Sequence, residues 1–262
     1  MTTSEAIIKA ADLLHQAAVT SKPVAPIRDL LPGGTVDTAY AVQEVNTKRA
    51  LEAGRRLVGR KIGLTSLAVQ KQLGVNQPDY GMLFADMAVP DGWEMTRSQL
   101  IQPKVEAEIA FVVGRDMTDA DLTMADVFRS IDYAVAAIEV VDSRIADWKI
   151  GILDTIADNA SSGLYVLGND PRRLTDVDLR LCGMVMEIKG EPISTGAGAA
   201  CLGHPLNSVL WLARTMARMG RPLLAGDTLM SGALGPMAPV VWGDVVEARI
   251  EGLGSVRAAF AA

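Results

Sequence analysis

The stretch PKVEAEIAFVV, residues 103–113, is an apolar, β-prone run that contains two carboxylates two residues apart. In a strand such residues point to the same face, so Glu106 and Glu108 should stand side by side, roughly 6–7 Å apart by strand rise. At that separation two like charges repel by about 2–3 kcal/mol at an effective dielectric near 20, and burial adds a desolvation cost. A divalent cation is the simplest way to offset this repulsion, because Mg²⁺ and Mn²⁺ favour carboxylate and water ligands.

A second apolar run, YAVAAIEVV at residues 133–141, contains one further isolated carboxylate, Glu139. Taken alone, the Glu106/Glu108 pair is more typical of the solvated face of an edge strand, where Lys or Arg would pair with it. Three lone carboxylates on two apolar strands instead favour a metal-binding triad. Water and substrate would supply the remaining ligands of an octahedral ion.

Composition and charge restrict the class of protein. The chain has 262 residues, 49% of them apolar and 21% charged, which is typical of a globular protein with a substantial core. The net charge is −6 and no run of Lys or Arg forms a basic patch, so small molecules are favoured over nucleic acid or a membrane surface as partners. Two cysteines without C-x-x-C spacing and an N-terminus without signal-peptide features predict a soluble, cytoplasmic protein.

Helices are expected early in the chain and strands later. A helix should begin at a Thr2–Glu5 capping box and end at residues 21–23, and a second should run from Asp37 as N-cap to Gly54. Further helices are expected at 65–73, 117–129 and 205–220, and strands at 57–64, 103–113, 133–141, 164–167, 182–188, 192–195, 228–231, 240–241, 245–250 and 255–260. This order predicts an α+β fold with a helical N-terminal portion, residues 1–56, on a β-rich core, residues 57–262.

Two charged residues outside these runs have both a structural and a chemical interpretation. Lys61, in the strand 57–64, is by spacing alone an exposed strand residue. If it pointed into the metal pocket, its ammonium could neutralise carboxylate charge, hold a substrate carboxylate, or relay protons with a lowered pKa. Asp79, in the segment 78–81, is either a turn former or a general acid or base at the mouth of the pocket.

The two histidines offer little support for a hydrolase. His15 is expected on the surface of the first helix, and His204, immediately before Pro205, should serve a helix start. A Ser231–His204–Asp227 triad would also need a G-x-S-x-G elbow to expose its nucleophile, and the sequence has none.

Several segments together resemble the 2-keto-4-pentenoate hydratases of the fumarylacetoacetate hydrolase superfamily. They are GRKIGLT at 59–65, GVNQPDYG at 74–81, LFADM at 83–87, VEAEIA at 105–110, AIEVV at 137–141, DNAS at 158–161 and CLGHPLN at 201–207. The resemblance implies mixed β-sheets folded into a roll, a Mg²⁺ or Mn²⁺ ion held by Glu106, Glu108 and Glu139, and a homo-oligomer. It further implies hydration of 2-hydroxypenta-2,4-dienoate to 4-hydroxy-2-oxopentanoate in the meta-cleavage breakdown of aromatic compounds.

The 4-oxalocrotonate decarboxylases are similar to the chain in the same lysine and glutamate segments. Their LNHPAN and GSF motifs correspond here to LGHPLN at 202–207 and to SGALGPM at 231–237, which favours the hydratase. In that hypothesis Lys61 and Asp79 are the candidate proton carriers, and Asn159 and Ser161 are candidate contacts of substrate or water. The alternatives are a decarboxylase of 2-oxo-3-hexenedioate, an acylpyruvate hydrolase, and a structural partner subunit of such a decarboxylase. Associated pathway enzymes are further candidate partners.

Overall fold

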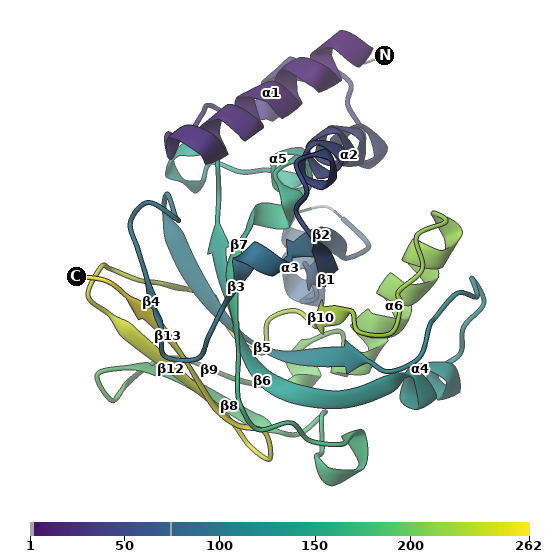
Figure 1. Ribbon diagram of the computed structural model, residues 1–262, viewed down its shortest axis with the longest axis vertical. Helices are drawn as coiled ribbons and strands as arrows, with labels where there is room; N and C mark the ends of the chain where they lie inside the picture. Colours follow the sequence, from purple (N-terminus) through teal and green to yellow (C-terminus); the bar gives the residue numbers. More distant parts are fainter. Residues whose placement is uncertain (1–2, 74) are drawn as a thin grey trace.

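Two β-sheets and a layer of helices make up the structure, a computed structural model that describes residues 3–73 and 75–262 (Figure 1). The strands of the larger sheet are β1 (Leu57–Gly63), β2 (Asp79–Phe84), β3 (Ala88–Val89), β5 (Pro103–Val113), β6 (Ile131–Asp142), β7 (Ser162–Leu167), β10 (Thr228–Met230) and β11 (Ala238–Pro239). Their order is β2-β1-β10-β5-β6-β7-β3, with β11 paired to β5. The long β5–β6 pair curves, so that this sheet wraps around as a half-barrel (Figure 1).

The smaller sheet packs against the larger one. Its strands are β4 (Glu94–Met95), β8 (Gly183–Ile188), β9 (Glu191–Ala197), β12 (Val245–Ile250) and β13 (Gly254–Phe260). They lie in the order β4-β13-β12-β8-β9, and β12 and β13 contact β6 of the larger sheet. The apolar residues between the two sheets belong to the main hydrophobic core of the protein.

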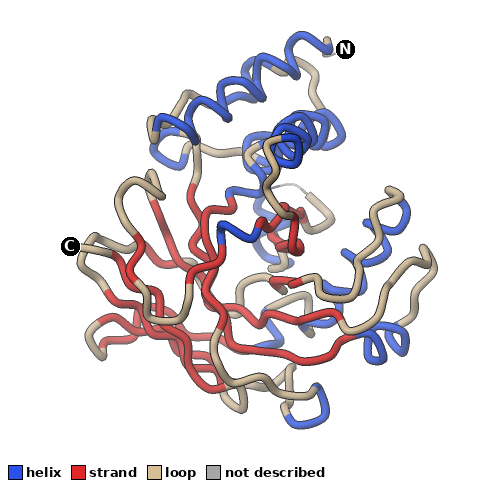
Figure 2. Tube along the Cα trace, in the orientation of Figure 1, coloured by secondary structure: helices blue, strands red, loops and turns tan. Residues whose placement is uncertain are grey.

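Helices lie mainly around the larger sheet. They are α1 (Ser4–Thr20), α2 (Val36–Glu52), α3 (Leu67–Leu73), α4 (Met124–Ser130), α5 (Ile152–Ala157) and α6 (Pro205–Arg218). Short 3-10 helices occur at Ile27–Leu30, Ala85–Met87, Ala146–Trp148, Asn159–Ser161, Leu174–Asp176 and Gly198–Ala200. Figure 2 shows α1, α2 and α5 gathered at one end of the molecule. None of the helices within the described residues is long and apolar enough to cross a membrane.

The helix ends follow the chemistry of their capping residues. The first helix is capped by Thr3, whose side chain accepts the Ala6 N–H at 3.2 Å, whereas the predicted cap Thr2 lies outside the described residues. The prediction of Asp37 as a cap is wrong: Thr35 caps α2 because its hydroxyl and that of Thr38 bond each other's backbone N–H groups. At the other end of α2, Gly54 adopts a left-handed φ of +83°, as predicted.

Most predicted strands are confirmed, and the differences have local causes. The expected helix over 117–129 is wrong at its start, because Met117 is buried in a bridge to Leu223 and α4 begins only after Thr123. The expected strand at 240–241 is instead β11 at 238–239, which pairs with β5. The expected turn at 78–81 is wrong as well, because β2 begins at Asp79 and pairs with β1. Gly74, which belongs to the same polar segment, lies outside the described residues.

The helical layer has its own hydrophobic cluster, which extends beyond the N-terminal portion. Leu14 and Val42 contribute from α1 and α2, and Ile145 and Ile156 contribute from the segment that follows β6. The buried side chain of Gln43 also donates hydrogen bonds from α2 to the carbonyls of Tyr80 in β2, at 3.0 Å, and Ile156 in α5, at 2.9 Å. The boundary between residues 56 and 57 stays a prediction. The helices before it contact β2 and the segment 145–157, which both follow it.

Replacing Gly59 with Ala is expected to destabilise the larger sheet. A Cβ at this position would lie 1.8 Å from the carbonyl oxygen of Thr228, so β1 and β10 would have to separate. We expect a loss of at least about 3 kcal/mol, or roughly 6–12 °C in melting temperature. Gly183→Ala is the matched control, because only the side-chain oxygen of Glu251 lies near, at 3.9 Å. Equal melting temperatures for the two variants would contradict the prediction.

Candidate active site

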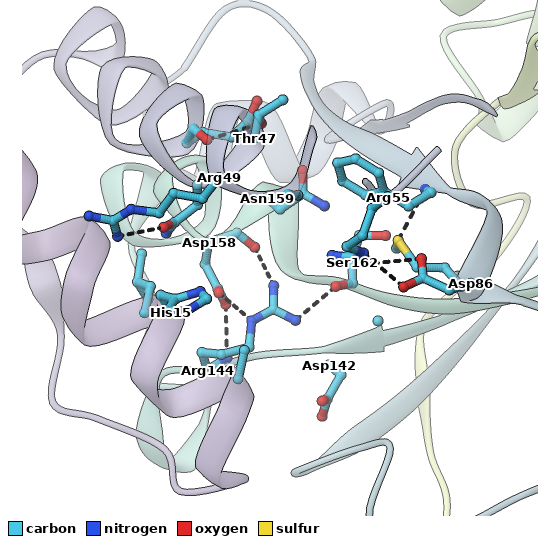
Figure 3. Close-up of a pocket in the computed structure, with 18 of the residues that line it drawn as sticks. His15, Thr47, Arg49, Arg55, Asp86, Asp142, Arg144, Asp158, Asn159 and Ser162 are labelled. Atoms are coloured by element: carbon cyan, nitrogen blue, oxygen red, sulfur yellow. Dashed lines mark hydrogen bonds and ion pairs between the residues drawn. The ribbon is translucent and has the colours of Figure 1, made fainter. Parts of the chain in front are cut away.

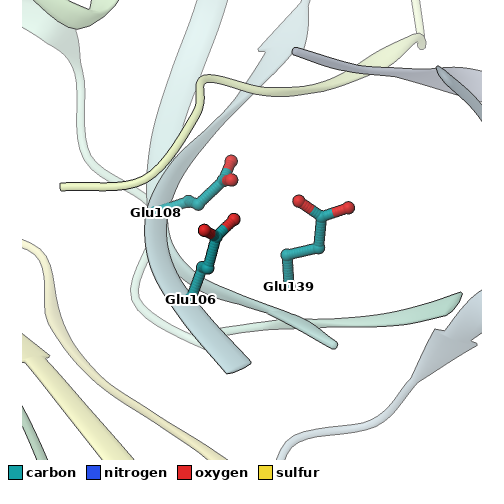
Figure 4. A group of neighbouring side chains, drawn as sticks. All are labelled: Glu106, Glu108 and Glu139. Carbon is teal, nitrogen blue, oxygen red and sulfur yellow. The ribbon is translucent and has the colours of Figure 1, made fainter. Parts of the chain in front are cut away.

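Three glutamates of the larger sheet converge on one point. Glu106 and Glu108 project from the same face of β5, and Glu139 of β6 is the direct cross-strand partner of Glu106. One carboxylate oxygen from each of the three lies within 4.8 Å of the other two. Figure 4 shows the three carboxylates pointing toward one another. The sequence-based prediction that these carboxylates lie together is confirmed, and their ligand role is considered below.

The cluster contains carboxylate oxygens that lack hydrogen-bond donors. Glu108 and Glu139 are fully buried, and within the described part of the chain Oε1 of Glu108 and Oε2 of Glu139 accept no hydrogen bond, while Oε1 of Glu139 has only an ion pair with Lys61. Glu108 Oε2 accepts a hydrogen bond from the Gly232 N–H at 2.8 Å. Burial, followed by repulsion from Glu139, raises the pKa of Glu106 to about 7 and the pKa of Glu108 well above its ordinary value. Buried, mutually repelling oxygens are the donor set that a hard divalent cation requires.

Lys61 lies beside this cluster rather than on the surface. It is 3% exposed, its Nζ is 3.2 Å from Glu139 Oε1 in an ion pair, and it donates to the carbonyl of Ala160 at 3.0 Å. Burial alone would lower the pKa of Lys61, but Glu139 and three further carboxylates outweigh it and raise that pKa. The exposed-strand interpretation and the expectation of a lowered pKa are therefore wrong for this arrangement, because the curled sheet turns Lys61 toward four carboxylates.

Asp79 is also buried, in β2 next to Lys61. Burial raises the pKa of this carboxyl to about 6, while the Lys61 ammonium opposes the shift. Its Oδ1 has no hydrogen-bond donor within the described residues. A Cβ on the paired residue Gly63 would lie 2.2 Å from Asp79 Oδ1 and 3.4 Å from Lys61 Nζ. The missing side chain at Gly63 thus lets the two ionisable groups approach each other.

The segment Asn159–Ser161 forms a left-handed turn next to Lys61. All three residues have positive φ, at 54°, 51° and 52°, and left-handed helical conformation costs about 1–2 kcal/mol per non-glycine residue. The turn places the Ala160 carbonyl on the Lys61 ammonium and buries Ser161, whose hydroxyl lies 3.2 Å from that of Thr155. Strain of this kind is concentrated at functional sites, where surrounding bonds hold it in place.

Asn159 holds one side of the turn. Its side-chain oxygen accepts the Met82 N–H at 2.7 Å, and its side-chain nitrogen donates to the Met82 carbonyl at 3.0 Å. Both polar atoms of the carboxamide are therefore bonded to β2. The expectation that Asn159 contacts the substrate stays a prediction.

Two residues that were not predicted as site residues, Arg144 and Asp158, also hold the turn in place. Arg144, which is partly buried, and Asp158, which is buried, form an ion pair beside a cavity of about 430 Å³ (Figure 3). The cavity is lined by residues of α1 and α2, by Arg144 and by Asp158, Asn159 and Ser162, and its lining includes neither Lys61 nor the three glutamates. The signals in the sequence were that Arg144 lies in a polar segment after an expected strand, at 142–147, and that Asp158 lies in the polar segment 154–163 and begins the DNAS segment at 158–161.

Comparison with known proteins identifies relatives over nearly the whole chain. The family described as "Fumarylacetoacetate (FAA) hydrolase C-terminal" matches residues 60–261. A protein of Pseudomonas putida strain F1 named TodF product hydratase is 67% identical over 256 residues, which cover 98% of this chain and 96% of that protein. A 2-keto-4-pentenoate hydratase of Paraburkholderia xenovorans strain LB400 is 57% identical over 252 residues, covering 96% of this chain and 94% of the relative.

A solved structure is similar over the same length. The 4-oxalocrotonate decarboxylase from Pseudomonas putida G7, complexed with magnesium and adipate, has a TM-score of 0.94 to this chain at 39% identity, and covers 99% of both chains. The predicted α+β roll is thereby confirmed. The chain belongs to the fumarylacetoacetate hydrolase family and, within it, to the 2-keto-4-pentenoate hydratases.

Proposed function

We propose that this chain is a hydro-lyase that converts 2-hydroxypenta-2,4-dienoate, the enol form of 2-keto-4-pentenoate, to 4-hydroxy-2-oxopentanoate in meta-cleavage degradation of aromatic compounds. Its membership of the hydratases supports the reaction. The observation that carries the mechanism is the group of three glutamates with unsatisfied buried oxygens beside Lys61 and Asp79. Glu106, Glu108 and Glu139 would hold a divalent cation, Mg²⁺ or Mn²⁺, and the magnesium and adipate bound by the related decarboxylase support this assignment.

The overall reaction adds one water molecule and requires several proton transfers. The dienol loses the proton of its 2-hydroxyl and gains one at C5, after which hydroxide adds at C4 and a proton at C3. When bound, a divalent cation supplies a Lewis acid for the 2-oxygen and orients the carboxylate of the substrate. The protein itself must then provide groups that exchange protons with the carbon chain of the substrate, at the end away from its carboxylate.

Asp79 and Lys61 are the groups suited to these transfers. The carboxyl of Asp79, with a pKa of about 6, exists in both protonation states near neutral pH, and its Oδ1 accepts no hydrogen bond from the described residues. The Lys61 ammonium stands among Asp79, Glu139 and the Ala160 carbonyl, where it can return a proton or hold developing negative charge. The hydroxyl of Ser161 is the proposed contact with substrate or water, and Asn159 would need to share its bonds to Met82 to act in the same way.

A direct test monitors loss of the ultraviolet absorbance of the dienoate with purified enzyme. Activity should stop with a chelator, return on addition of Mg²⁺ or Mn²⁺, and give 4-hydroxy-2-oxopentanoate as the product. The second candidate function, decarboxylation, is favoured by the likeness to the 4-oxalocrotonate decarboxylase. Release of CO₂ from 2-oxo-3-hexenedioate without hydration of the dienoate would overturn the proposal in its favour, and full turnover by metal-free enzyme would remove the cation from it.

Cation affinity is expected to fall as the pH drops below about 7. Burial and Glu139 raise the pKa of Glu106 to about 7, and they raise the pKa of Glu108 well above its ordinary value. Below these values the carboxyls hold protons that a cation must displace, so apparent affinity should fall about tenfold per pH unit for each displaced proton. Calorimetric titration with Mg²⁺ across this range, in buffers of different ionisation enthalpy, measures both affinity and proton release. An affinity that does not change with pH would contradict the prediction.

Homo-oligomeric assembly, association with other pathway enzymes and a cytoplasmic location stay predictions from the sequence. They are not needed for the chemistry proposed here. Light scattering can examine the homo-oligomeric assembly, and cell fractionation can examine the location.

A further inference from the structure

Arg144 forms hydrogen bonds to the residues at both ends of the left-handed turn, Asp158 and Ser162. Its guanidinium donates to the Asp158 carboxylate and to the Asp158 carbonyl, and at 2.8 Å to the carbonyl of Ser162 (Figure 3). Its backbone N–H also donates to Asp158 Oδ2 at 2.8 Å. The two carbonyls that flank residues 159–161 are therefore held by one planar group.

These bonds work together with the bonds of Asn159. The carboxamide of Asn159 fixes the turn to Met82, and the Ser161 N–H closes the turn on the Asp158 carbonyl at 2.9 Å. Three successive non-glycine residues with positive φ persist only when such contacts over-determine them. Arg144 supplies the contacts on one side and Asn159 those on the other.

We propose that Arg144 is a positioning residue for hydration. Acting through the turn, it fixes the Ala160 carbonyl that accepts from Lys61 and the hydroxyl of Ser161, and it sets where the ammonium stands relative to Glu139. This inference rests on the proposed function, since it takes Lys61 and Ser161 as working groups. The planar fork with separate N–H groups is essential, because a lysine at this position carries all three of its N–H donors on one nitrogen and cannot span two carbonyls and a carboxylate as the three guanidinium nitrogens do.

The cavity beside the turn makes this role testable by chemical rescue. Arg144 and Asp158 both line it, and the Arg144 side chain is 12% exposed. Truncation of Arg144 would leave space next to the Asp158 carboxylate that a free guanidinium ion can enter from the cavity. A free guanidinium ion, which has the same shape as the end of the arginine side chain, can then restore the missing hydrogen bonds.

Arg28→Ala is a matched control. Arg28 also donates to a buried aspartate, Asp154, and to a backbone carbonyl, that of Lys149, but it makes no bond to the turn. Both variants lose an arginine–aspartate pair and should lose stability. Only the Arg144 variant should change the chemistry.

The experiment measures kcat, KM, cation content and amide hydrogen exchange for cation-loaded Arg144→Ala, Arg144→Lys and Arg28→Ala. We expect Arg144→Ala to lose about 100-fold in kcat with KM little changed, since misplacement of reacting groups by about 1 Å has effects of this size. Guanidinium at concentrations well below those that denature should restore at least about tenfold, while ammonium restores nothing. Exchange at residues 159–161 should speed up in Arg144→Ala and slow again with guanidinium. Cation content should stay that of the wild type in all three.

The outcomes separate this inference from the proposed function. A kcat for Arg144→Ala close to that of Arg28→Ala, or exchange at 159–161 no faster than in Arg28→Ala, would overturn the role of Arg144. If Arg144→Ala does not fold, Arg144→Lys decides the question, because a charge without the planar fork should still lose about tenfold in kcat. A wild-type enzyme inactive on the dienoate would instead overturn the proposed function, and the exchange measurements would still show whether Arg144 holds the turn.

Discussion

Replacing both Glu106 and Glu108 with Gln is expected to abolish turnover and the response to a divalent cation. The two carboxylates supply two of the three proposed ligands, and an amide oxygen is a neutral, weaker ligand for a hard cation. We expect kcat/KM to fall by about 10³-fold or more, because charge stabilisation at the reacting oxygen is lost with the cation. Steady-state kinetics and metal analysis of the purified variant measure the two effects.

The same variant should differ from the wild type in stability. Without cation, the wild-type cluster holds repelling carboxylates whose pKa values burial raises, so removing two of them should raise the melting temperature of the metal-free protein. Added Mg²⁺ should raise the melting temperature of the wild type alone, because a ligand stabilises only the protein that binds it. Glu247→Gln, at a partly buried glutamate of β12 paired with Arg257, is the control. Full activity in the metal-stripped double variant would refute the proposed site.

Replacing Lys61 with Met is expected to lower turnover while the cation remains bound. Methionine fills the same buried space but removes the ammonium that faces Glu139, Asp79 and the Ala160 carbonyl. Loss of one positioned proton carrier lowers rates by about 10²–10⁴-fold. The cation should still bind, because all three glutamates are retained and a competing positive charge is gone. Kinetics together with metal content measure both parts.

Lys149→Met is the matched control for Lys61. Lys149 pairs with Asp147 at 3.0 Å, but both side chains are largely exposed, so this ion pair contributes little. Turnover of the control should equal that of the wild type. If Lys61→Met lost the cation as well as activity, Lys61 would be needed to assemble the cluster, and the role given to it here would be wrong.

The carboxylate cluster could be predicted from the sequence because its geometry is local to each strand. Alternation places Glu106 and Glu108 on one face of β5 whatever the strand pairs with. That Glu139 lies directly opposite Glu106 depends on the β5–β6 register, which no local pattern determines. The sequence therefore identified the three residues but not how close their oxygens come.

Lys61 and Asp79 show where local patterns are insufficient. Their strands sit at the far end of the sheet order from β6, and only the curl of the whole sheet brings Lys61 to Glu139. Spacing alone therefore favoured an exposed lysine and a turn aspartate. The left-handed turn was also beyond reach, because its conformation is imposed by contacts from Met82 and Arg144, which lie far away in sequence from one another.

The hydrogen bonds of Gln43 determine which fragments of this enzyme can be separated or exchanged. A fragment beginning at residue 57 would lack the side-chain amide of Gln43, which joins the carbonyl of Tyr80 to that of Ile156 near the end of α5. It would also expose the side chain of Ile156 to water. Because α5 runs directly into the strained turn, these contacts connect the first fifty-odd residues to the environment of Lys61. Exchange of this helical layer between related enzymes should therefore preserve activity only when residues 145–157 are transplanted with it.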